Sequence, residues 1–208
     1  MYLLDVNVLL AFWYCDHTAH LKVTQWIRDV EFLNPGIELF KTCSIVELGF
    51  IRVASGPAGF AETVEGARSD LREAKAALGA ALLSDEVEGD RQPTWVTKSR
   101  QTTDGHLLEL AGQHKMRLAT LDRGIPGAVV IPIHTSEVRE PTYARYLEMT
   151  TEDPPENLIY DENEVPVPGY PYPRWMIDPE TGYPCVRSRL GVPKITSEEV
   201  REMLKDFP

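Results

Sequence analysis

The chain has 208 residues, 43% apolar and 25% charged, which suits one globular domain with an appendage rather than two full domains. It contains no apolar run of the roughly 20 residues that cross a bilayer and no signal-peptide start, so we expect a soluble, cytoplasmic protein without a membrane partner. The net charge of −11 argues against nucleic-acid binding through a broad basic surface, but it is compatible with a nuclease whose acids hold metal ions.

Short apolar runs typical of strands alternate with helical patterns across residues 1–150. We expect strands at 2–4, 38–42, 117–120 and 128–133, and helices at 7–12, 18–30, 44–53, 60–83 and 104–114. The 60–83 segment carries the longest apolar stripe, and Thr102 or Thr103 is expected to cap the helix at 104–114. This alternation predicts an α/β fold with a mostly parallel sheet flanked by helices, and ligands at the carboxyl ends of its strands.

The character of the chain changes near residue 150. Eight prolines lie between 154 and 184, and residues 151–164 contain six acids and no base. Because proline removes an amide donor and fixes φ, we expect 151–195 to form an extended arm without a core of its own. Thr196 and Glu199 form a capping box that predicts a short terminal helix. We therefore divide the chain into a 1–150 domain and a 151–208 arm.

Four acids occupy positions that suggest a shared function. Asp5 and Asp122 follow predicted strands, Asp104 begins a predicted helix, and Glu47 lies in an apolar helical segment where a lone carboxylate is costly. Clustered carboxylates suit Mg²⁺ or Mn²⁺. Each acid also has an ordinary interpretation, as a helix charge, a loop or cap residue, or a side chain that reaches solvent. The pattern alone leaves both interpretations open.

A family resemblance favours the metal site. The segments that carry it are LLDVNVLL at 3–10, SIVELGF at 44–50, RQTTDGHLLELA at 100–111 and LATLDRG at 118–124. In this order they resemble the four acidic segments of PIN domains, and most closely those of the VapC toxins of bacterial toxin–antitoxin pairs. The resemblance extends over roughly residues 1–135 and implies a PIN-like, Rossmann-like fold.

The resemblance also implies a chemistry. Asp5, Glu47, Asp104 and Asp122 would be the catalytic carboxylates and would hold one or two Mg²⁺ or Mn²⁺ ions. The cation would activate water for in-line hydrolysis of an RNA phosphodiester. Asn7 and Thr120 would orient the acids or bind water, and Arg123 would contact the substrate phosphate or neutralise an acid.

The arm has a resemblance of its own. DPETGYPCVR at 178–187 and GVPKITSEEV at 191–200 resemble the neutralising C-terminal segment of VapB-type antitoxins. This resemblance implies that an arginine enters the acidic pocket and inhibits it, with Arg187 and Arg189 as candidates and Arg174 as a third. The chain would then be a toxin silenced by its own tail or by the tail of a second subunit, and we expect a homodimer.

Two alternatives remain at the level of sequence. The first is an active RNA-processing PIN nuclease whose tail recruits another protein. The second is an interaction module that kept the PIN fold without turnover, which the complete set of four acids disfavours.

Overall fold

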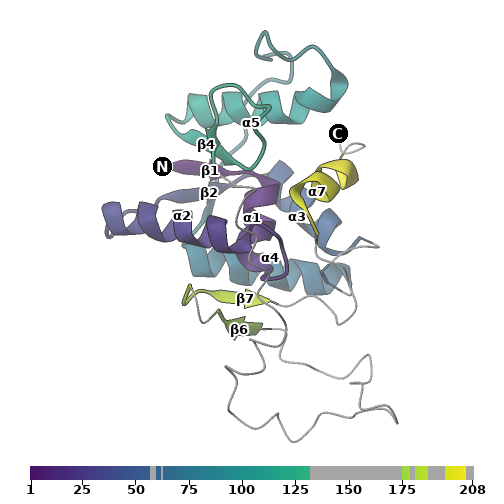
Figure 1. The fold of residues 1–208 in the computed structure, drawn as a ribbon. Coiled ribbons are helices and arrows are strands. Elements are labelled where there is room, and N and C mark those ends of the chain that lie inside the picture. The colour runs from purple at the N-terminus through teal and green to yellow at the C-terminus, as the bar shows by residue number, and fades with distance from the viewer. Residues whose placement is uncertain (57–59, 62, 132–174, 179–180, 187–194, 205–208) are drawn as a thin grey trace, which may run out of the picture. The chain divides into compact units, whose positions relative to one another are not determined.

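The computed structural model describes residues 1–56, 60–61, 63–131, 175–178, 181–186 and 195–204 (Figure 1). Its centre is a five-stranded sheet in the order β3-β2-β1-β4-β5, and every neighbouring pair is parallel. The strands are β1 (Tyr2–Leu4), β2 (Phe40–Thr42), β3 (Ala81–Leu82), β4 (Arg117–Thr120) and β5 (Val129–Val130). The predicted α/β architecture with a parallel sheet is confirmed.

The strand order reverses at β1, which pairs with β2 on one side and with β4 on the other. In open α/β sheets, this reversal leaves a crevice beyond the carboxyl ends of the strands, where ligands bind. Leu4 lies opposite Ala119 in the register, so the residues that follow β1 and β4 emerge side by side. The chain therefore brings Asp5 and the 120–124 segment to the same place.

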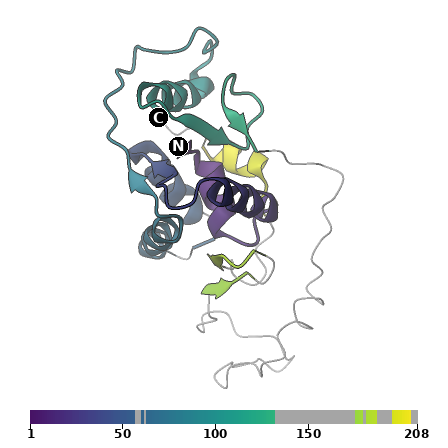
Figure 2. The same cartoon turned by 90° about the vertical axis from the view of Figure 1, so that its left-hand side faces the viewer.

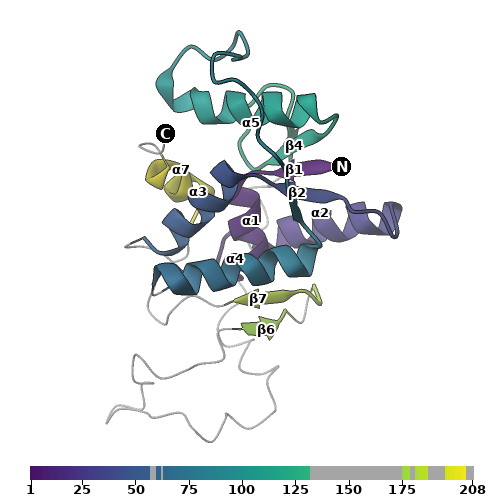
Figure 3. The ribbon, with the colours of Figure 1, turned by 180° about the vertical axis from the view of Figure 1, so that it is seen from behind.

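The helices cover both faces of this sheet. They are α1 (Val6–Trp13), α2 (His20–Leu33), α3 (Ser44–Ala54), α4 (Val64–Leu78), the 3-10 turn η1 (Ser99–Gln101) and α5 (Thr102–Gln113). Figures 1 and 3 show α5 on one side of the strands, and α1, α2 and α4 on the other. Right-handed crossovers explain this division. The chain crosses the sheet in one direction from β1 through β2 to β3, and in the opposite direction from β3 to β4, so the helices of the two crossovers lie on opposite faces. None of the described helices is long and apolar enough to span a bilayer.

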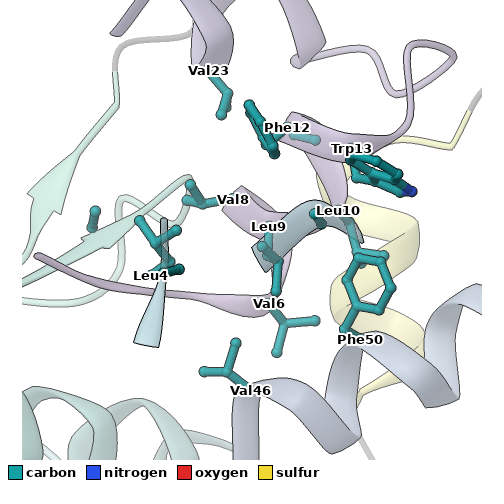
Figure 4. Packing of buried hydrophobic residues seen from close by; sticks show 14 of the residues in the cluster. Leu4, Val6, Val8, Leu9, Leu10, Phe12, Trp13, Val23, Val46 and Phe50 are labelled. Atoms are coloured by element: carbon teal, nitrogen blue, oxygen red, sulfur yellow. The ribbon is translucent and has the colours of Figure 1, made fainter. Parts of the chain in front are cut away.

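The α1 helix is the centre of the core. All eight of its residues are buried, as expected for a helix that is apolar on every side. Figure 4 shows Val6 and Leu10 of α1 beside Val46 and Phe50 of α3. Because α1 begins immediately after Asp5, this packing fixes the position of that carboxylate.

The predicted helix at 60–83 was too long. The α4 helix begins after Thr63, whose side chain accepts a hydrogen bond from Gly66 N–H, and ends at Gly79 in the left-handed conformation (φ 58°). Leu82, which was assigned to the apolar stripe, lies in β3 and is largely exposed. The apolar spacing continued past both caps, so it did not reveal where the helix stops.

The predicted cap of α5 was also wrong. Thr102 and Thr103 lie inside the helix, which continues directly from η1. Gln101 stabilises the entry instead, because its side-chain oxygen accepts hydrogen bonds from Thr97 N–H (3.1 Å) and Lys98 N–H (3.0 Å). The remaining predicted elements up to residue 133 match observed ones, with shifted ends and a shorter final strand.

The described parts of the tail pack against the sheet domain, in one compact unit with residues 1–131. Strands β6 (Trp175–Ile177) and β7 (Pro184–Val186) form an antiparallel hairpin, and β7 runs beside α4 (Figures 1 and 3). The α7 helix (Ser197–Met203) begins with the predicted Thr196–Glu199 capping box. The predicted boundary at residue 150 falls outside the described residues.

Candidate active site

Asp5 is held at the end of β1 by two hydrogen bonds. One carboxylate oxygen accepts from Val6 N–H (2.7 Å), which caps α1, and the other accepts from the Thr120 hydroxyl (2.7 Å). Thr120 is fully buried and also accepts a hydrogen bond from Asp122 N–H (3.0 Å). The threonine therefore links the two aspartates that follow neighbouring strands.

Asp104 approaches the same place from the first turn of α5. Together with Asp5, Asn7 and Asp122, it lines a cavity of about 490 Å³ at the carboxyl edge of the sheet. Residues 99–101 and 103 form another wall of this cavity, and Arg100 is exposed there. The structure thus brings three of the four predicted acids to one pocket.

Burial and neighbouring carboxylates oppose the ionisation of Asp5 and Asp104. Burial raises the pKa of Asp5, helped by Asp122 and resisted by the hydrogen bonds from Thr120 and Val6. Burial, followed by repulsion from Asp5 and Asp122, raises the pKa of Asp104 to about 7. Raised carboxylate pKa values of this kind are typical of functional sites, because bringing like charges together in a buried pocket lowers the stability of the fold.

Glu47 lies elsewhere in the structure. It is half-buried in the first turn of α3, it is not among the residues that line the cavity, and it accepts a hydrogen bond from the Thr42 hydroxyl (2.6 Å). Lys75 of α4 forms an ion pair with the same carboxylate oxygen. Its predicted role as a metal ligand stays a prediction, and its observed partner is a lysine that lies 28 residues away.

A cation from the tail reaches the pocket. The guanidinium Nε of Arg201, in α7, lies 3.0 Å from an Asp122 carboxylate oxygen, and Arg201 lines the cavity. Arg201 also lowers the pKa of both Asp5 and Asp104, opposing the effect of burial. The arginine therefore offsets part of the negative charge that the three carboxylates share.

Ribonucleases from Mycobacterium tuberculosis resemble this chain. Ribonuclease VapC38 is 34% identical over 128 residues, which span 60% of this chain and 87% of that protein. The chain belongs to the VapC ribonuclease family. VapC44 is 31% identical over 61% of this chain and 92% of its own, and VapC29 is 30% identical over 64% and 98%. No family model matches.

Family membership confirms the PIN-type interpretation of the fold and extends to about three fifths of the chain. The antitoxin-like character of the tail lies outside what these VapC relatives demonstrate, and it stays a prediction. The predicted inhibitory residues Arg174, Arg187 and Arg189 lie outside the described residues. The sequence prediction passed over Arg201, although the capping box placed it next to the inward-facing Val200.

The pocket offers a VapC-type metal site suitable ligands. Its charged donors are carboxylate oxygens, which Mg²⁺ and Mn²⁺ prefer, and the buried Asn7 side-chain oxygen has no hydrogen-bond partner among the described residues. Within the same part of the chain, no three His, Cys, Asp or Glu side chains are already gathered to hold an ion. The chemistry of the site fits a divalent cation, while the observed arrangement directs Asp122 toward Arg201.

Proposed function

We propose that this protein is a metal-dependent endoribonuclease of the VapC toxin type that hydrolyses RNA phosphodiester bonds. The observation that supports this proposal best is the pocket itself, where Asp5, Asp104 and Asp122 meet beyond the strand-order reversal in a family of ribonucleases. We keep a cytoplasmic location and a homodimer as parts of the proposal.

The carboxylates are proposed to hold Mg²⁺ or Mn²⁺. Asp5 is held firmly, because the Thr120 hydroxyl and the start of α1 each bind one of its carboxylate oxygens. A divalent cation there supplies Lewis-acid chemistry, lowering the pKa of water and offsetting charge on the phosphate under attack. The Asn7 side-chain oxygen, which has no hydrogen-bond partner in the described part of the chain, is proposed to orient a water molecule. In this proposal, Glu47 becomes a metal ligand only if its ion pair with Lys75 breaks and its side chain turns into the pocket.

Two arginines are proposed to bind the RNA backbone. The net charge of −11 repels a polyanion, so local cations must hold the phosphates next to the site. Arg100 lies on the cavity wall, on a turn that Gln101 holds rigid, and Arg123 follows Asp122 directly. Arg100 was not selected from the sequence, because nothing in its local pattern separates it from an ordinary surface arginine.

The tail is proposed to inhibit the enzyme. Arg201 pairs with Asp122 and contributes a positive charge where a cation would bind, so helix and metal compete for one carboxylate. The Val200 side chain, which is fully buried, holds the helix in place. The inhibitory arginine in this proposal is Arg201, from the same chain or from a second subunit.

The test is Mn²⁺-dependent cleavage of a panel of single-stranded RNAs by full-length variants. Arg201→Gln should raise cleavage by about fivefold, because a half-exposed ion pair stabilises docking by only about 1 kcal/mol. Val200→Asp should raise cleavage on the order of a hundredfold, because the helix must leave to solvate the new charge. Arg68→Gln, which removes an exposed arginine paired with Glu65 on α4, is the matched control and should change nothing.

Adding Asp5→Asn to either activated variant should abolish cleavage. If wild type cuts as fast as the Val200→Asp variant, the tail does not inhibit, and the recruitment alternative replaces this part of the proposal. If no variant cuts any RNA while Mn²⁺ still stabilises the protein, the interaction-module alternative is favoured instead.

A further inference from the structure

The turn between β6 and β7 is built around Asp178. Its backbone N–H donates to Tyr183 O (2.9 Å), and its carbonyl oxygen accepts from Gly182 N–H (2.7 Å). The Thr181 hydroxyl donates to the Asp178 carboxylate (2.6 Å). This closed turn presents a buried carboxylate, 2% exposed, to the sheet domain.

The sheet domain supplies a partner for that carboxylate. His20, at the start of α2, has one ring nitrogen 2.8 Å from Ala11 O and the other 3.1 Å from an Asp178 oxygen. A carbonyl oxygen only accepts, so Nδ1 is the donor to Ala11 O, and Nε2 faces the Asp178 carboxylate. Both side chains are about 3% exposed, so their contact is shielded from water and from salt.

The next turns of α2 bind the rest of the hairpin. Arg28 donates to Thr181 O, and the Tyr183 hydroxyl donates to the Glu31 carboxylate. The Tyr183 ring packs edge-on against Phe12 of α1, with centroids 5.6 Å apart. Further along β7, Cys15 N–H donates to Val186 O (3.2 Å), and Cys185 and Val186 are buried. One face of α1 and α2 therefore recognises the hairpin through polar and apolar contacts together.

The α7 helix docks mainly through apolar contacts. It has seven residues, a length that is marginal for an isolated helix, and its half-exposed Arg201 pairs with Asp122 in the pocket. Val200 and the preceding Ile195 are buried, and Met203 and Leu204 pack against the core while partly exposed. Figure 2 shows the hairpin and α7 at separate places on the unit, and eight residues lie between Val186 and Ile195.

We infer that the tail binds at two independent points: the β6–β7 hairpin is a lasting anchor in its own site on α1 and α2, and α7 is a releasable plug in the acidic pocket. The eight intervening residues can reach about 26 Å when extended, so the helix can leave while the hairpin stays. The anchor then keeps α7 at high effective concentration near the pocket. The consequence for inhibition rests on the proposed function, but the existence of two separable contacts does not.

Cysteine chemistry can separate the two contacts in the full-length protein. Cys185 lies in the hairpin and Cys43 lies in the core, and both are buried cysteines that form no disulfide. The labelling rate of each thiol, followed by mass spectrometry, therefore reports hairpin release and global unfolding separately. Asp178→Ala should raise the Cys185 rate by about tenfold or more, because it removes the partner of the buried His20 Nε2. Tyr183→Phe, a milder change, should raise it by about threefold through the loss of one hydrogen bond.

Arg201→Gln should leave the Cys185 rate within about twofold of wild type, because the ion pair that it removes belongs to the other contact. Arg68→Gln is again the control. The inference is overturned if Arg201→Gln raises the Cys185 labelling rate as much as Asp178→Ala does, since the tail would then move as one body. It is also overturned if neither Asp178→Ala nor Tyr183→Phe raises the labelling rate of Cys185. If Asp178→Ala also raises the labelling rate of Cys43, that variant unfolds globally. The milder Tyr183→Phe variant then tests whether the hairpin is released on its own. Absence of RNA cleavage in every variant would count against the proposed function and leave the labelling result intact.

Discussion

Burial and the neighbouring Asp5 and Asp122 disfavour the charged form of Asp104, so the contribution of Asp104 to stability depends on pH. Its pKa is about 7 in the folded protein, against an ordinary value of 3.8. Between these two values the folded state binds more protons than the unfolded state, so the free energy of unfolding falls as pH rises. The favourable contribution of a protonated Asp104 is complete below about pH 4 and is lost as the pH passes 7.

Asp104→Asn should therefore stabilise the protein at pH 8 and have little effect at pH 4. Discounted for partial exposure, the relief is about 1–2 kcal/mol, and losing a negative charge at a helix N-terminus offsets about 0.5 kcal/mol of it. Thermal unfolding in EDTA at several pH values measures the difference. Asp90→Asn, at an exposed loop acid, should show the same small effect at every pH. A pH-independent Asp104→Asn effect would contradict the raised pKa that burial and the neighbouring Asp5 and Asp122 give Asp104.

A residue of the site could be predicted from the sequence where it directly follows a strand, because the end of the strand fixes its location. Asp5 and Asp122 were both predicted at the carboxyl ends of strands, whereas the pairing of these two strands side by side came from the structure. The ion pairs of Glu47 with Lys75 and of Asp122 with Arg201 could not be predicted in this way. They join residues that are 28 and 79 positions apart, and nothing local to either residue marks its partner.

At the scale of elements, the end of α4 gives a direct test of what stops a helix. Gly79 has a positive φ of 58°, and a Cβ there would meet nothing within 4 Å, so strain is the only cost of a side chain. Gly79→Ala should lower stability by about 1 kcal/mol. Gly112→Ala, in the last turn of α5 with equally open space, should raise it by about 0.5–1 kcal/mol. Urea unfolding of both variants at constant m-value measures the contrast; equal effects of the same sign would refute the assignment of Gly79 as the cap.

The same glycine explains why the helix was overpredicted at 60–83. Leu78 and Leu82 are four residues apart, as on a helix face, yet Leu78 ends α4 and Leu82 is exposed in β3. Periodicity records which residues are apolar and does not record a reversal of φ. By contrast, Thr196 and Glu199 lie three residues apart and satisfy each other's backbone, so the start of α7 was predictable from two side chains.

For the whole molecule, the α/β core followed from local alternation, whereas the docking of the tail did not. His20 and Asp178 are 158 residues apart, and nothing in the sequence around either residue identifies the other as its partner. A contact of this span depends on how two complete elements fit together. The proline-rich composition predicted an extended arm. It gave no sign that β6 and β7 form a hairpin that binds to α1 and α2.

The last prediction concerns which chain's tail fills the pocket. The 43 residues between Ile131 and Trp175 can span up to about 140 Å, so geometry does not require exchange between subunits. A tether of this length gives an effective concentration on the order of a millimolar, far above the concentration of a second chain in an assay. We therefore expect docking in cis, and the residual cleavage per mole of wild-type chain should stay constant over about a thousandfold dilution. An excess of Asp5→Asn chains with intact tails should likewise fail to inhibit the Arg201→Gln variant. Inhibition by those added chains, or activity that rises on dilution, would instead establish a swapped tail, and with it a dimer in which each subunit silences the other.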